Sequence, residues 1–76
     1  PNSMKDMREK GAKYFYEQQK KERPNGVVVF RLGELYEKQG KFKKACKQFK
    51  ELAKTDLKYL YVGWIYTVQM VIQLQN

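Results

Sequence analysis

Residues 24–58 read PNGVVVFRLGELYEKQGKFKKACKQFKELAKTDLK, and this stretch predicts a helical hairpin. Its first half carries apolar or aromatic residues at spacings of three and four, namely Val29, Phe30, Leu32 and Tyr36. Its second half continues the pattern with Phe42, Ala45, Cys46, Phe49, Leu52 and Ala53. Such spacing places side chains on one face of a helix. Because only a short turn at Gln39-Gly40 separates the halves, the two helices are expected to be antiparallel.

The hairpin also carries spaced residues of a known repeat. The pattern is Val29-x2-Leu32-Gly33-x2-Tyr36 followed by Ala45-x3-Phe49. It resembles the W-x2-L-G-x2-Y and A-x3-F signature of the tetratricopeptide repeat, with Val29 in place of Trp and Leu57 in place of Pro. Gly33 and Ala45 are small enough for two helices to approach closely. The resemblance implies an all-α fold, a short tetratricopeptide-like right-handed helical solenoid of about four helices.

The expected helices cover about residues 4–22, 26–38, 42–54 and 57–75 of a single domain spanning 4–76. Residues 1–3 fit no pattern in the rest of the chain and are interpreted as a cloning remnant. The residues Arg23-Pro24-Asn25-Gly26 should end the first helix.

A second copy of the signature begins near Leu57. There, Tyr59-x2-Val62-Gly63-x2-Tyr66 echoes the first pattern and aligns Gly63 with Gly33. The period of this echo is shorter than the usual repeat length of about 34 residues. The echo indicates a further partial repeat, with a tightened turn between the repeats.

The first helix has two registers in the repeat. In one, Ala12-x3-Tyr16 followed by Pro24 matches the second half of the signature, so the helix would be the second helix of a preceding repeat. In the other, Met7-x2-Lys10-Gly11-x2-Tyr14 matches the first half. The first register is preferred because it leads into Val27 with nearly the right phase. The second register makes residues 8–12 resemble repeat domains that clamp the carboxylate end of heat-shock chaperones, with Arg8 as the basic residue.

The last segment is uncharged from Tyr59 to Asn76. Its apolar residues surround nearly the whole helix, which is typical of a buried helix. We expect downstream sequence, a partner or a second copy of the chain to cover it. The uncharged run approaches the length of a membrane span. Because Thr67 and several amides are costly in lipid and no basic cluster follows, a buried solenoid helix is favoured and a membrane partner is not expected.

Composition limits the function classes. Seventy-six residues make one small domain, which disfavours a free-standing enzyme with a deep pocket. Sixteen Lys and Arg against eight Asp and Glu give a net charge of +8, which favours an acidic partner. The single Cys46 suits a reducing, intracellular setting such as the cytoplasm. With no His and no phosphate-binding loop, neither a metal nor another cofactor is expected.

Lysines form a stripe on the second helix of the hairpin, which we call the lysine stripe: Lys43, Lys44, Lys47, Lys50 and Lys54. One interpretation is a solvated outer face. The other is an electrostatic surface that binds nucleic acid or an acidic protein. The carboxylates Glu34 and Glu37 near Tyr36 lack an accompanying nucleophile or metal cluster, so no catalytic residue is predicted.

Ligands of the repeat family usually lie in a concave groove formed by the first helix of each hairpin. Carried over by position, the resemblance places these residues in a partner-binding groove: Phe30, Glu34, Glu37, Lys38, Leu60, Trp64, Thr67 and Val68. The predicted function is therefore a non-catalytic protein-interaction module. It would bind a helix or peptide of another protein, or self-associate as a homo-oligomer through the apolar C-terminal helix. Nucleic-acid binding through the lysine stripe is the alternative.

Overall fold

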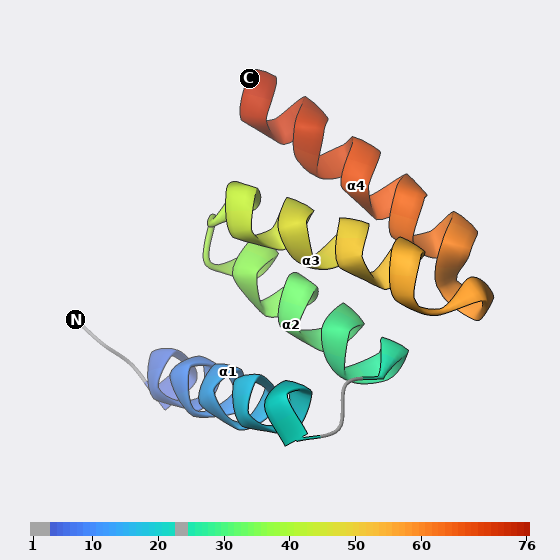
Figure 1. Ribbon diagram of the computed structural model, residues 1–76. Helices are drawn as coiled ribbons and strands as arrows, with labels where there is room; N and C mark the ends of the chain where they lie inside the picture. Colours follow the sequence, from blue (N-terminus) through green and yellow to red (C-terminus); the bar gives the residue numbers. More distant parts are fainter. Residues whose placement is uncertain (1–3, 23–24) are drawn as a thin grey trace.

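A computed structural model describes residues 4–22 and 25–76, and it is helical throughout (Figure 1). Its elements are α1 (Met4–Glu22), α2 (Gly26–Lys38), α3 (Phe42–Thr55), the short 3-10 helix η1 (Leu57–Tyr59) and α4 (Leu60–Gln75). This confirms the all-α class, since these described ranges contain four α-helices and no strand. The suggested cloning remnant at 1–3 and the breaker residues Arg23 and Pro24 lie outside the described ranges.

Local sequence signals set the helix ends. The Asn25 side chain caps α2 by accepting a hydrogen bond from the Val28 backbone N–H at 3.1 Å. Gly40 adopts a positive φ of 75° in the turn after α2, a conformation that glycine adopts at little cost. The Asp56 side chain accepts from the Lys58 N–H at 3.0 Å. That cap starts η1, so the segment expected as one helix from 57 is divided into η1 and α4.

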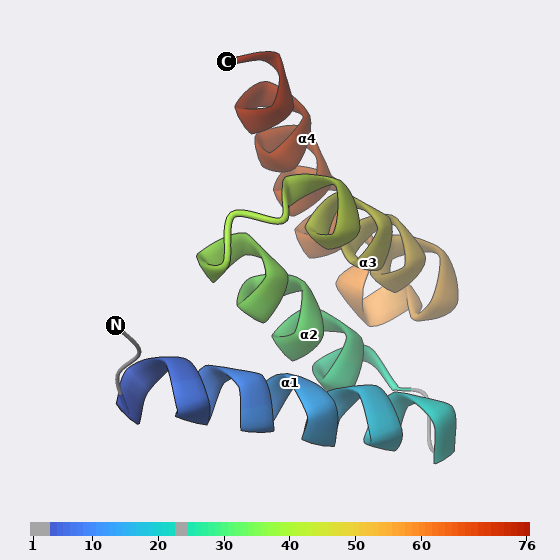
Figure 2. The same cartoon turned by 90° about the vertical axis from the view of Figure 1, so that its left-hand side faces the viewer.

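The helices alternate in direction. α1 and α3 run one way across the molecule, and α2 and α4 run the opposite way (Figures 1 and 2). Each helix packs against its neighbours in the sequence, so α3 lies between α2 and α4. α1 packs mainly on α2. Helix α3 is therefore covered on two sides, whereas α1 and α4 are each covered on one.

The core forms along α3, where Ala45, Phe49 and Leu52 are fully buried. Val29, Leu32 and Tyr36 of α2 pack on one side of it, and Met70 of α4 packs from the other. Two glycines permit the close contacts. A Cβ at Gly33 would lie 2.6 Å from the Phe49 ring, and a Cβ at Gly63 would lie 2.7 Å from the Ala53 backbone nitrogen.

Helices α2 and α4 share three equivalent buried positions. α2 begins at Gly26 and α4 begins at Leu60. We call the shift in residue numbering that places the start of α2 on the start of α4 the packing shift. The same shift places three buried residues of α2 on buried residues of α4. It carries Val29, Gly33 and Tyr36 of α2 onto Gly63, Thr67 and Met70 of α4, and all six are buried.

The packing shift differs from the echo that the sequence presents. The echo aligns Gly63 with Gly33 and therefore pairs buried Thr67 with half-buried Glu37, and buried Met70 with exposed Gly40, which lies beyond the end of α2. The packing shift instead aligns Gly63 with Val29, one helical turn earlier in α2. The shift that relates these buried residues is therefore longer than the period of the echo.

Candidate functional site

The outward side of α4 is an exposed apolar stripe. Its members, which we call the α4 face, are Tyr61, Trp64, Ile65, Val68, Val71 and Ile72. They recur at spacings of three and four, so they occupy one broad side of the helix. No other part of the chain within 4–22 and 25–76 buries them. Because a contiguous exposed apolar patch commonly marks an interaction site, the α4 face is the leading candidate.

A second exposed apolar stripe lies on α1. The α1 face consists of Met4, Met7, Tyr14 and Phe15. Gly11 lies between them, and a Cβ added there would meet no atom within 4 Å. These positions lie on the side of α1 away from α2, because Ala12 and Tyr16 point toward α2 and line a cleft with Arg31. The periodicity of this face is visible in the sequence, but no signature of a site accompanies it there.

The structure separates two of the aromatic residues expected to share a groove. Phe30 is half-buried, with its ring centroid 5.1 Å from that of Tyr66 and 6.0 Å from that of Phe49. Trp64 and Tyr66 are two residues apart and so point about 200° apart around the helix. Because Tyr66 faces α2, Trp64 points away from it. Phe30 is a packing residue between helices, and Trp64 belongs to the exposed α4 face.

The remaining groove candidates fall in different surroundings. Thr67 is buried, and its hydroxyl donates to the Gly63 carbonyl at 2.7 Å. Glu34 is paired with Arg31, with 3.2 Å between the carboxylate and the guanidinium. Lys38 is exposed, and it lines the cleft beside α1 together with Glu34. Glu37 and Leu60 are half-buried, and Val68 is exposed on α4.

All five residues of the lysine stripe are exposed on α3. Exposure is required both by a solvated face and by a charged docking surface, so it does not choose between the two interpretations. Lys44 has a further contact, because its ammonium lies 5.7 Å from the centroid of the Tyr36 ring. This distance is within the range of a cation–π interaction.

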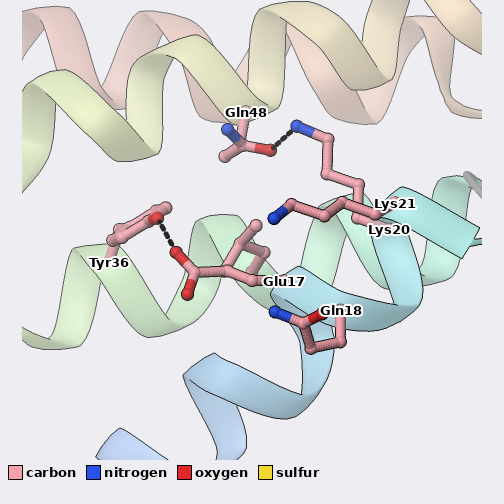
Figure 3. Close-up of a pocket in the computed structure, with 7 residues that line it drawn as sticks. Glu17, Gln18, Lys20, Lys21, Tyr36 and Gln48 are labelled. Atoms are coloured by element: carbon pink, nitrogen blue, oxygen red, sulfur yellow. Dashed lines mark hydrogen bonds between the residues drawn. The ribbon is translucent and has the colours of Figure 1, made fainter.

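A cleft of about 400 Å³ lies where α1 crosses α2 and α3. Figure 3 shows polar side chains from all three helices converging on it. The Tyr36 hydroxyl donates to the Glu17 carboxylate at 2.7 Å. The Lys20 ammonium donates to Gln48 Oε1 at 2.9 Å and is paired with Glu51 at 2.6 Å. Polar contacts of Glu17 and Lys20 therefore connect α1 to α2 and α3, in addition to the packing of Tyr16 against the core.

The hydroxyl of Tyr36 is strongly held in its protonated form. Burial and then the hydrogen bond and negative charge of Glu17 raise the pKa of Tyr36 to about 12. Two ammonium groups also approach the ring, from Lys44 and from Lys13 at 5.9 Å. Tyr36 thus joins α1, α2 and α3 at one point. Its phenol stays protonated at physiological pH and donates to Glu17, which links α1 to α2.

Comparison with protein-family models, with curated proteins and with solved structures gave no match. Within the described ranges, none of the helices combines the length and the apolar character needed to cross a membrane.

Proposed function

We propose that the chain is a tetratricopeptide-like helical stack whose function is non-catalytic self-association through the α4 face. The packing shift supports the repeat architecture, because it corresponds to the length of that repeat, about 34 residues. The close approaches at Gly33 and Gly63 support it as well. In this architecture α2 and α3 form one hairpin, α4 is a first helix, and α1 is a second helix.

The observation that carries the proposal is the α4 face, six apolar side chains in a segment without a charged residue from 59 to 76. Burying a large apolar side chain contributes about 1.5–3 kcal/mol. Because these side chains are already partly buried, with exposed fractions between 38% and 79%, covering all six would contribute on the order of 5–10 kcal/mol before the cost of association. This gain favours association that covers the face.

The occupant we assign to the α4 face is the α1 face of a second copy. In a stack of hairpins, a first helix is covered by a second helix, and α1 has that character. The packing shift carries Phe15 onto Phe49, yet Phe15 is 53% exposed and Phe49 is fully buried. Pairing α4 of one copy with α1 of the next would bring two exposed apolar faces together and bury Phe15, although the equivalents of Ile65 and Val68 on α2 stay solvated, so the contact differs from the packing of α2 on α3.

The net charge of the chain and the exposed area of the two apolar faces are consistent with a second copy as the occupant. The chain carries +8, so most of its surfaces repel a second copy, but α4 contributes no charge to the contact. A fully exposed large side chain presents roughly 150–250 Å², so the partly exposed α1 and α4 faces together offer on the order of 1,000 Å². This is near the lower limit of about 1,200 Å² for a specific interface, which predicts association in the micromolar range.

The test is sedimentation of three matched single variants over a range of concentrations. Phe15→Lys disrupts the α1 face, Val68→Lys disrupts the α4 face, and Val27→Lys places the same charge on exposed α2. The proposal predicts that the first two remain monomeric while the wild type and Val27→Lys associate. Association of Phe15→Lys would exclude the α1 face as the occupant. A wild type that stays monomeric at about 1 mM, well above a micromolar dissociation constant, would refute self-association.

A further inference from the structure

A second cleft, separate from the apolar faces, is lined mainly by lysines. Its volume is about 350 Å³, and it lies between α1 and the turn that joins α2 to α3. We call it the lysine cleft, and its lining residues are Glu9, Lys10, Lys13, Lys38, Gln39 and Lys41. Four ammonium groups therefore face one carboxylate. Nothing in the sequence indicates that these lysines share a site, because they come from two separate segments, residues 9–13 and 38–41.

The ammonium groups in the lysine cleft repel one another. The neighbouring ammonium of Lys13, followed by desolvation and the charge of Lys44, lowers the pKa of Lys41, while the Glu17 carboxylate partly offsets the effect. Lys13 and Lys44 also flank the Tyr36 ring, at 5.9 and 5.7 Å from its centroid. Three like charges are thus gathered at one end of the cleft, an arrangement that costs folding stability.

Gln39 contributes unused hydrogen-bonding capacity at the same place. Its side-chain Oε1 is buried and has no hydrogen-bond partner within 4–22 and 25–76. Buried polar atoms are nearly always paired, so an unpaired one in a lined cleft is notable. The amide could accept a hydrogen bond from a protonated ligand oxygen, or turn its NH₂ group toward an anion.

We propose that the lysine cleft binds a small dissolved polyanion of the phosphate class. Lysine ammonium groups each offer three donors and act as point charges, which suits phosphate oxygens approached from several sides. The volume is within the range of small-molecule sites. Among the described residues, none that lines the cleft is aromatic, so there is no ring on which a nucleotide base could stack. The ligand is therefore recognised through its charge, as a compact diphosphate would be.

The probe is inorganic pyrophosphate, titrated calorimetrically into the intact chain in a phosphate-free buffer. Lys13→Gln/Lys41→Gln removes two cleft charges, and Lys50→Gln/Lys54→Gln removes two exposed charges from α3 as a control with equal net charge. The proposal predicts saturable binding that is at least tenfold weaker in the cleft variant and changes less than twofold in the control. Equal losses in both variants, or no saturation in the wild type, would overturn it.

Thermal unfolding supplies a readout that separates binding from a purely structural role. Without pyrophosphate, the cleft variant should unfold at a higher temperature than the wild type, because two repelling charges are gone. With saturating pyrophosphate, the wild type should gain stability by ligand linkage and the variant should not. A variant that is destabilised without ligand, or equally stabilised by pyrophosphate, contradicts the proposal.

Discussion

Helices α2 and α4 hold equivalent positions in the stack but present different outward faces. On α2 the outward residues include Arg31, Glu34 and Lys38, which border the cleft beside α1, and the first two form an ion pair at 3.2 Å. The residues that the packing shift places at the same positions of α4 are Ile65, Val68 and Ile72, all of them exposed. Their inward faces are alike, with Val29, Gly33 and Tyr36 matched by Gly63, Thr67 and Met70. The two helices therefore share part of their inward pattern and differ in their outward one, which is charged on α2 and apolar on α4.

The largest effect is expected from transferring the outward residues of α2 to α4. The variant Ile65→Arg/Val68→Glu/Ile72→Lys copies Arg31, Glu34 and Lys38 at their equivalent positions. Because the charged groups would be desolvated in the contact, self-association should weaken at least 100-fold, about 2.7 kcal/mol. Sedimentation equilibrium measures the change, and circular dichroism should show unchanged helix content.

The reciprocal variant Arg31→Ile/Glu34→Val/Lys38→Ile sharpens the comparison. It gives α2 the outward residues of α4, so it should add a second apolar contact and produce larger oligomers than the wild type. If the transferred charges on α4 leave association unchanged, the outward residues are not what distinguishes the two helices.

A smaller effect is expected at the two glycines of the inward faces. Gly63→Ala should destabilise the fold by about 2 kcal/mol, because the new methyl group would meet the Ala53 backbone, which cannot move aside. Gly33→Ala should cost less, since its contact is the Phe49 side chain. Urea unfolding of both variants measures the difference. A stabilised Gly63→Ala, as helix propensity alone predicts, would show that the contact between α3 and α4 is looser than in the structure.

A smaller loss of stability is expected from a change at Tyr36, whose equivalent position on α4 is occupied by Met70. Tyr36→Phe removes the 2.7 Å hydrogen bond to Glu17 and should lower the free energy of unfolding by about 1 kcal/mol. The loss should be confined to the packing of α1, so hydrogen exchange should accelerate in α1 more than in α4. Equal acceleration in both helices would mean that the contact acts on the whole stack.

The pH dependence tests the same contact with the smallest expected change. The pKa of Tyr36 is raised from 10.0 to about 12, so the folded chain keeps a proton that the unfolded chain loses between these values. The stability from this group is complete below pH 10 and is lost as pH rises toward 12. Lys41 has a lowered pKa and acts in the opposite direction below its ordinary 10.5. The difference between wild type and Tyr36→Phe should therefore shrink as pH rises toward 12, and a constant difference would contradict the raised pKa of Tyr36.

The helical order could be predicted from sequence because it depends on local signals. Periodic apolar residues, the Asn25 cap and the Gly40 turn all act within a few residues. The equivalence of α2 and α4 could not be predicted in the same way. The sequence pattern aligns Gly63 with Gly33, whereas the packing places Thr67 at the position equivalent to Gly33. A glycine is conspicuous in a sequence, but a buried threonine that satisfies its own hydroxyl fits the same position.

The candidate surfaces were predictable in part. The absence of charge in α4 pointed to an uncovered helix, and exposed Trp64 and Val68 belong to its face. Phe30 could not be assigned from sequence, because only the crossing of α2 and α4 brings it against Tyr66. The lysine cleft was also beyond sequence reasoning, since Lys13 and Lys41 come together only through the packing of α1 on α2.

The most direct test of self-association through α4 is to mix two variants that cannot associate alone. Phe15→Lys keeps an intact α4 face, and Val68→Lys keeps an intact α1 face. An equimolar mixture should form a one-to-one heterodimer in sedimentation velocity and grow no further, because each complex has only disrupted faces left. Two monomers that remain separate in the mixture would contradict the pairing of the α4 face with the α1 face.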